Sequence, residues 1–276
     1  MGAVRIGARA HDFGRMTASN LAKAITQKGF ASVQLAPQKA IEGVNVFADA
    51  TPAILEGIRA DFEKHQLAID ILGCYVEPSL LDKEARLAQV ATFHQGILNA
   101  KILGTSIIGT ETTHLAPDTP AGERAKVFEL LLDSVLRMVE VAEREGITIA
   151  IEPVADHTLN TPELTRELLD KVDSQRLKVI FDPFNLTLPS RVGEQKAIYQ
   201  GVFDLLSDDI AIIHLKDMVV KDGVKTWANI GKGQIDYDTI FPHLNKRWGH
   251  IPILREEVKP EFADVDIENI IKYKKL

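Results

Sequence analysis

The sequence predicts an α/β fold in which eight strand-then-helix units close into a single (β/α)8 TIM barrel. Short apolar, β-branched runs alternate with amphipathic stretches of helical length, which is typical of a parallel sheet covered by helices. The 276 residues hold eight such units without a low-complexity linker, so one barrel domain is expected over residues 1–276. No Gly-x-Gly-x-x-Gly turn follows the first strand, so nothing favours an open dinucleotide-binding sheet.

In the first half of the chain, each apolar run is followed by a stretch with helix-start signals. Ser19-Asn20 offers an N-cap for the first helix, and Thr51-Pro52 opens the second. Thr119 is the expected N-cap of the fourth and longest helix, with Pro120 inside it. The expected strands are 4–10, 30–35, 67–75 and 105–110, and the expected helices are about 20–28, 51–66, 82–103 and 119–145.

The second half repeats this pattern with short, strongly apolar strands. The run 148–153 is β-branched and ends in Glu152-Pro153, which indicates a strand buried on both faces. Thr161-Pro162 caps the helix that follows it. The remaining expected strands are 179–181, 210–213 and 251–254, and the remaining helices are about 194–206, 237–246 and 264–275.

Composition excludes several classes of protein. The formal charge of −7 argues against a protein whose main affinity is for nucleic-acid phosphates. No apolar run approaches the roughly 20 residues that span a bilayer, so no membrane association is expected. The lone Cys74 leaves no internal disulfide, and the N-terminus lacks a signal-peptide profile, so the cytoplasm is the expected compartment.

The candidate site comes from residues at the ends of the last four strands. Glu152, Asp182, His214 and Glu256 each follow an apolar run, and they stand 30, 32 and 42 residues apart, about one unit each. Because a closed barrel brings all strand carboxyl ends to one rim, these four side chains are expected to converge. Glu256 is preferred over Glu257, because neighbouring side chains point to opposite faces of a strand.

Three carboxylates and one imidazole form a mostly hard set of ligands. Such a set suits one divalent ion, Mn²⁺ or Mg²⁺ first, with Co²⁺ or Zn²⁺ as further candidates. The carboxylates also need a cation, because three anions at one rim repel each other or take up protons. The sequence therefore predicts a metal site formed by Glu152, Asp182, His214 and Glu256.

With these residues the sequence resembles the xylose-isomerase-like barrels, a family of sugar and sugar-phosphate isomerases and epimerases. The resemblance covers nearly the whole chain and depends on the order and spacing of a few segments. These are Glu152, Asp182, His214 and Glu256, together with His214-Leu215-Lys216-Asp217 and Gly231-x-Gly233-x-x-Asp236-Tyr237. The resemblance implies that the four strand-end residues hold one divalent metal, and that the two glutamates exchange protons with the substrate.

The chemistry expected of such a site is a proton transfer on a sugar or polyol. A metal polarises the substrate carbonyl and stabilises the enediolate that forms when the neighbouring C–H loses its proton. Glu152 and Glu256 are the expected acid/base pair, since one carboxylate can take the proton and the other can return it. Resemblance to the family also implies a homo-oligomer, a dimer or a tetramer.

One position departs from the ketose 3-epimerases of the family. They place a His three residues after the metal-binding Asp, whereas this chain has Asn185, which cannot titrate. This weakens the case for 3-epimerisation of free ketoses and leaves other isomerisations, or dehydration, open. The expected substrate contacts are His11, Glu111, His157, Asn185, Lys216 and Trp227, and a loop, ion-pair or packing role is the alternative for most of them.

Three other functions stay open at this stage. A dehydratase of cyclic polyols, of the inosose type, would use the same metal site to eliminate water. An abasic-site DNA-repair endonuclease shares the barrel, but the negative net charge and Asn185 count against it. A non-catalytic binding protein is the third, and absence of metal and of proton exchange from a bound ketose would favour it.

Overall fold

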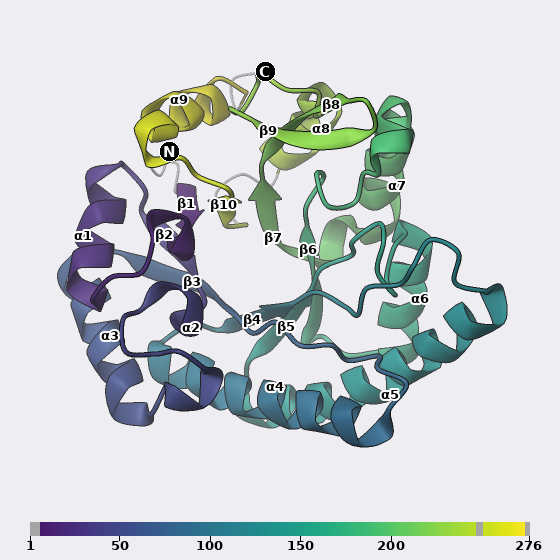
Figure 1. Ribbon diagram of the computed structural model, residues 1–276, viewed down its shortest axis with the longest axis horizontal. Helices are drawn as coiled ribbons and strands as arrows, with labels where there is room; N and C mark the ends of the chain where they lie inside the picture. Colours follow the sequence, from purple (N-terminus) through teal and green to yellow (C-terminus); the bar gives the residue numbers. More distant parts are fainter. Residues whose placement is uncertain (1–5, 247–250, 274–276) are drawn as a thin grey trace.

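The computed structural model describes residues 6–246 and 251–273. Its centre is a closed barrel of parallel strands in the order β1-β10-β7-β6-β5-β4-β3-β2, and the pairing of β1 with β10 closes the ring (Figure 1). The predicted (β/α)8 barrel is therefore confirmed. The barrel strands are β1 Ile6–Arg9, β2 Ser32–Leu35, β3 Ala68–Gly73, β4 Ile107–Thr110, β5 Thr148–Ile151, β6 Leu177–Phe181, β7 Ile210–Leu215 and β10 Ile253–Arg255.

Helices surround the barrel as an outer ring (Figure 1). Thr51 and Thr161 cap their helices as predicted, each accepting a bond from a backbone N–H in the first turn. Thr17, rather than Ser19-Asn20, is the first N-cap, and Pro120 rather than Thr119 directly precedes α5. The helices in the described part of the chain are α1 Ala18–Gln27, α2 Pro37–Ala40, α3 Pro52–Lys64, α4 Lys83–Leu103, α5 Ala121–Glu145, α6 Pro162–Val172, α7 Gln195–Leu206, α8 Tyr237–Asn245 and α9 Ala263–Tyr273, with short 3-10 turns between some of them.

The first expected strand begins, and the last expected helix ends, outside the residues that the structure describes. Val4 and Arg5 of the first expected strand, and residues 274 and 275 of the last expected helix, are the residues concerned. None of the helices in the described ranges has the length and apolar character that crossing a membrane needs.

A compact apolar layer fills the inside of the barrel. Buried side chains from five strands meet there, and Gly7 and Gly109 supply two of the remaining positions, where a Cβ would overlap side chains of the same layer. Because side chains alternate along a strand, the residues two positions further on point inward as well, at the carboxyl ends. The inner apolar layer comprises Ile71, Ala150, Ile180, Ile212 and Leu254.

The next inward layer is polar, and it forms the mouth of the barrel. Each strand contributes one residue to this layer, namely the residue two positions after its inward-facing residue of the apolar layer. Its members, from β1 round the chain to β10, are Arg9, Gln34, Gly73, Glu111, Glu152, Asp182, His214 and Glu256. The four predicted metal ligands therefore occupy half of one layer.

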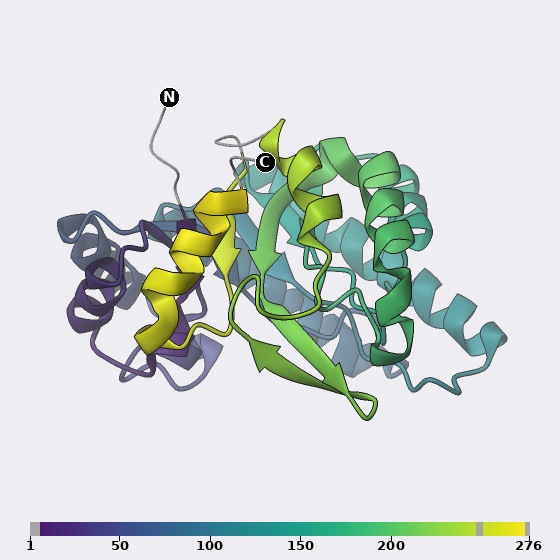
Figure 2. The same cartoon turned by 90° about the horizontal axis from the view of Figure 1, so that it is seen from above.

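An antiparallel hairpin that the sequence analysis did not predict follows β7. Its strands are β8 Asp217–Lys221 and β9 Val224–Ala228, and Figure 2 shows it extending beyond the carboxyl ends of the barrel strands. Asp222 and Gly223 connect the two strands, both with positive φ (50° and 76°), as a two-residue hairpin turn requires. The Lys225 Nζ donates to the Phe184 carbonyl over 2.7 Å, so the hairpin is attached to the loop after β6.

The carboxylate of Asp217 organises the loop between β9 and α8. It accepts bonds from the backbone N–H groups of Met218, Gly231, Gly233 and Ile235, at 2.8 to 3.1 Å. This explains the glycine spacing of that segment, because a Cβ at Gly233 would overlap the Asp217 carboxylate. Asp217 is therefore a structural residue of the loop.

Candidate metal centre

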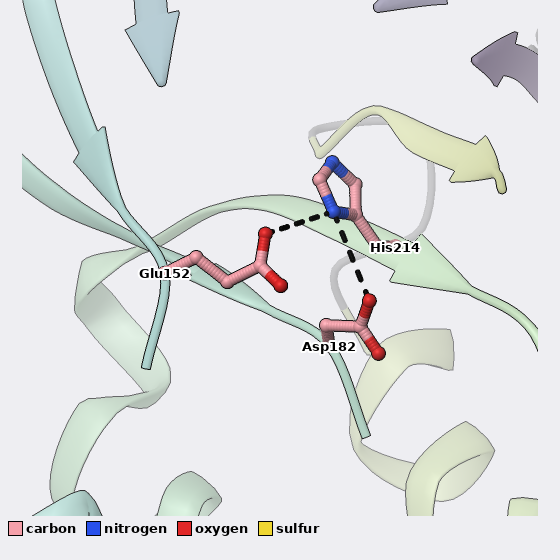
Figure 3. Close-up of side chains that lie close together, drawn as sticks. All are labelled: Glu152, Asp182 and His214. Carbon is pink, nitrogen blue, oxygen red and sulfur yellow. Dashed lines mark ion pairs between the residues drawn. The ribbon is translucent and has the colours of Figure 1, made fainter. Parts of the chain in front are cut away.

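Three buried side chains from consecutive strands converge at the mouth of the barrel. Glu152 directly follows β5, Asp182 directly follows β6 and His214 lies near the end of β7. The Nδ1 atom of His214 lies 3.2 Å from Oε2 of Glu152 and 4.0 Å from Oδ2 of Asp182 (Figure 3). One atom from each residue falls within 4.8 Å of the other two, which is close enough for a shared metal ion.

Glu256 reaches the same imidazole from the other side. Its Oε1 lies 3.3 Å from the His214 Nδ1, and the residue is buried. Arg255 points away from the mouth, since its Nε donates to Asp266 of α9 over 2.7 Å. At Glu257 the backbone has a positive φ of 55°, and the chain leaves the strand there. The structure therefore places Glu256, and not its neighbours, beside His214.

Lys216 supplies a positive charge inside this cluster. It lies two residues after His214 and faces the same way, and it is 4% exposed. Its Nζ lies 2.9 Å from Oδ2 of Asp182 and 2.7 Å from Oε2 of Glu256. The predicted ion pair of Lys216 is thus with these two acids, while Asp217 bonds to backbone groups.

Mutual attraction and burial set the protonation of the cluster. Burial alone would lower the pKa of His214, but Glu256, Glu152 and Asp182 raise it to about 9. Burial would raise the pKa of Glu256, but His214, Lys216 and Arg9 hold it well below its ordinary value. Burial raises the pKa of Asp182 in spite of Lys216. Without a metal, His214 therefore carries a proton at neutral pH.

The residues present fit a divalent cation. The buried Nδ1 of His214 faces carboxylate oxygens of Glu152, Asp182 and Glu256, at 3.2, 4.0 and 3.3 Å. Three buried carboxylates close to one nitrogen repel one another, and a divalent ion in contact with them would reduce that repulsion. Carboxylate oxygens and a neutral imidazole nitrogen are ordinary metal ligands.

Asn185 contacts the cluster directly. Its Nδ2 donates to Oε1 of Glu152 over 2.5 Å, and its backbone N–H donates to Oδ1 of Asp182 over 3.0 Å. The sequence analysis treated Asn185 as a substrate contact. In the structure its amide group binds the carboxylate of Glu152, and its contact with a substrate stays a prediction.

Three of the other predicted contacts, Glu111, His11 and His157, lie in the segments that follow β4, β1 and β5. Glu111 belongs to the same inward layer as Glu152, and burial, with repulsion from Glu152 and Glu256, raises its pKa to about 7. His11 follows β1, and its buried Nδ1 has no hydrogen-bond partner among the described residues. His157 lies in the loop after β5, with its Nε2 3.8 Å from Asp156.

Trp227 belongs to the hairpin, on β9. Its indole N–H donates to the Glu257 carbonyl over 3.0 Å, and its ring lies 5.9 Å from that of Phe262. This contact supports the chain just after Glu256, so the structure gives Trp227 a packing partner at the mouth.

Sequence analysis missed two cations at the mouth. Arg9 donates twice to Asp12 and once to Oε2 of Glu256, the last over 3.3 Å. Lys39 of α2 places its Nζ 3.9 Å from the centre of the Tyr75 ring. The position of Arg9 was predictable, because Arg9 ends the first strand on the inward face, whereas Lys39 lies on a four-residue helix without a sequence signal.

Comparison with known structures gives the same fold at low sequence identity. The IolI protein with a bound zinc atom has a TM-score of 0.74 and 16% identity, covering 98% of this chain and 96% of that one. The 3-keto-D-glucoside 4-epimerase YcjR from E. coli has a TM-score of 0.75 and 16% identity, covering 99% of this chain and 100% of that one. The probable 3-DHS dehydratase AsbF from Bacillus anthracis has a TM-score of 0.74 and 15% identity, covering 97% of this chain and 98% of that one.

A family model described as the xylose isomerase-like TIM barrel matches residues 22–256, which include all four predicted metal ligands. No curated protein matches the sequence closely enough to be counted as a relative. The closed barrel, the inward layer at its mouth and the extent of this match lead to one conclusion. The chain belongs to the xylose isomerase-like TIM barrel family.

Proposed function

We propose that the protein is a metal-dependent isomerase or epimerase of a sugar, sugar phosphate or related polyol. One observation carries the proposal: the buried carboxylates of Glu152 and Glu256 approach the same His214 nitrogen, at 3.2 and 3.3 Å. Two carboxylates that flank one substrate position can remove a proton and return it elsewhere. The sugar epimerases of the same fold support the substrate class.

Glu152, Asp182, His214 and Glu256 are the proposed ligands of one divalent ion. The bound ion would supply a Lewis acid that polarises a carbonyl group of the substrate. Oxygen-rich ligands favour Mn²⁺ or Mg²⁺, while the zinc in the IolI structure keeps Zn²⁺ a candidate. Metal analysis of the purified protein identifies the ion.

The chain's own residues divide the remaining work. Asn185 holds one oxygen of Glu152 and leaves the other facing His214. Lys216 and Arg9 both contact Oε2 of Glu256, which keeps that carboxylate ionised. Glu152, Lys216 and Glu256 are buried, which limits the access of water to the place where the proton moves.

Dehydration of a cyclic polyol is the second candidate. Asn185 favours it over 3-epimerisation of free ketoses, because an amide bonded to Glu152 replaces a group that titrates. The same site would then remove a proton and expel a hydroxyl group. Abasic-site cleavage is less well supported, because the net charge is −7.

The test is solvent-deuterium exchange into ketoses and inososes by the chelated and the Mn²⁺-reloaded protein. We expect exchange only with metal, and a loss of at least a hundredfold in Glu152→Gln and Glu256→Gln, in line with removal of a general base. Glu140→Gln, on the exposed side of α5, is the matched control. Exchange that survives both changes would overturn the assigned pair, and release of water identifies the dehydratase. The cytoplasmic location and the homo-oligomer stay predictions.

A further inference from the structure

The half of the barrel mouth formed by β1, β2 and β3 differs chemically from the metal centre. Gln34 of β2 donates from Nε2 to the Tyr75 hydroxyl over 2.8 Å, which fixes the tyrosine ring. Lys39 then places its ammonium group against that ring, 3.9 Å from the centre. Arg9 occupies the β1 position of the same inward layer, next to Glu256.

We infer that this β1–β3 subsite, made by Arg9, His11, Gln34, Lys39 and Tyr75, binds an anionic group at the end of the substrate away from the metal centre. The inference rests on the proposed function, because it assumes that the reacting end of the substrate lies at Glu152 and Glu256. It goes further by naming the substrate class: hydroxylated molecules that carry a carboxylate or a phosphate.

A lysine at the mouth without a carboxylate partner is the first argument, and Lys39 is solvent-exposed and so open to an incoming anion. Among the described residues, no carboxylate oxygen lies within 4 Å of Lys39 Nζ, whose recorded contact is the Tyr75 ring. Arg9 uses three of its five N–H donors on Asp12 and Glu256, so two remain. Burial and the nearby Arg9 lower the pKa of Lys39, as expected for cations held close together.

Buried polar atoms without partners are the second argument. Within the described part of the chain, Nδ1 of His11 and Oε1 of Gln34 are buried and make no hydrogen bond. Burial, Arg9 and Lys39 lower the pKa of His11 to about 4, so its imidazole is neutral at pH 7. A neutral imidazole and an amide oxygen suit hydroxyl groups, while Arg9 and Lys39 suit the anion.

Glu111, on the neighbouring strand, is the alternative counter-charge for Lys39. Burial and repulsion from Glu152 and Glu256 raise the pKa of Glu111 to about 7. Its carboxylate does not come within 4 Å of Lys39 Nζ, so it forms no ion pair with that cation. An incoming anion would complete the balance.

The test compares matched substrates and matched variants. Each ketose that undergoes exchange is offered in neutral form, with a terminal phosphate and with a terminal carboxylate. We expect Lys39→Gln to lower the ratio of kcat/KM for the anionic over the neutral form by roughly 10- to 100-fold, as for one charged hydrogen bond. Lys39→Arg should restore the ratio. Lys64→Gln, on the exposed last turn of α3, should leave the ratio unchanged.

A second measurement keeps this inference separate from the proposed function. Calorimetry with inorganic phosphate and with acetate, on the Mn²⁺-loaded protein, needs no turnover. We expect one of the two anions to bind at least fivefold more weakly to Lys39→Gln than to the unchanged chain. Equal binding and an equal substrate ratio in both proteins would overturn the subsite, even if exchange at Glu152 and Glu256 stands. Absence of exchange with weakened anion binding would refute the proposed function and keep the subsite.

Discussion

Asn185 connects two of the proposed metal ligands. Its amide donates to Oε1 of Glu152 over 2.5 Å, while its backbone N–H donates to Oδ1 of Asp182 over 3.0 Å. The loop after β6 therefore fixes a carboxylate that belongs to β5. A charge-assisted bond of this kind contributes about 1.5–3 kcal/mol, enough to hold one orientation of Glu152.

Asn185→Asp should impair activity at low pH. The change keeps the shape of the side chain but places a second carboxylate against Glu152, and such a pair keeps a proton to higher pH. We expect the acidic limb of the kcat/KM profile to move upward by about one pH unit or more. Asn20→Asp, on the exposed first turn of α1, adds the same charge and should not move it. An unmoved profile in Asn185→Asp would show that the amide does not position Glu152.

Lys216→Met should make stability depend on metal. Lys216 bridges the buried Asp182 and Glu256, and removal of one partner from a buried ion pair costs about 3–5 kcal/mol. Thermal unfolding with chelator should show this loss, and Mn²⁺ should raise Tm more in the variant than in the unchanged chain. Lys178→Met breaks a more exposed pair with Asp209 and should cost about 1 kcal/mol or less, without metal dependence. Equal losses in the two variants would contradict the prediction.

The stability of the metal-free protein should fall as the pH rises above neutrality. The folded state raises the pKa of His214 from 6.5 to about 9, because Glu256, Glu152 and Asp182 outweigh burial. The stabilisation is fully present below pH 6.5 and is lost as the pH rises through 9, at about 1.4 kcal/mol per pKa unit. Chemical unfolding of His214→Gln should lose this part of the slope, while His94→Gln, on α4, should keep it. If the free energy of unfolding depends on pH in the same way in the unchanged chain and in His214→Gln, the prediction is wrong.

Gly233→Ala should destabilise the loop that follows the hairpin. A Cβ at that position would overlap the Asp217 carboxylate and the Met218 carbonyl, so the loop bonds to Asp217 must rearrange. We expect a loss of about 1–3 kcal/mol in the free energy of unfolding. Gly57→Ala is the matched control, because nothing lies near its Cβ within α3. That change should stabilise by about 0.5–1 kcal/mol, and a similar gain at Gly233 would be incompatible with the described loop.

Sequence periodicity predicted the barrel and the convergence of its strand ends. Each of Glu152, Asp182 and His214 follows an apolar inward residue by two positions, so alternation along the strand alone brings them to one face. The same rule selected Glu256 over Glu257, and the structure places Glu256 beside His214. What these residues bind stays a proposal.

Contacts between loops could not be predicted from the sequence. The bond from Asn185 to Glu152 depends on how the segment after β6 folds back, and no local pattern encodes that path. The hairpin was a different kind of omission. Asp222-Gly223 is a strong two-residue turn signal between β-branched runs, and it would have predicted β8 and β9.

That hairpin ties two neighbouring loops of the barrel mouth to one another. It begins directly after Lys216, and Lys225 returns to Phe184, between Asp182 and Asn185. One external ribbon is thereby anchored at both ends to groups that surround the proposed cation. A displacement of this ribbon would therefore be transmitted through Lys225 to the loop that carries Asn185.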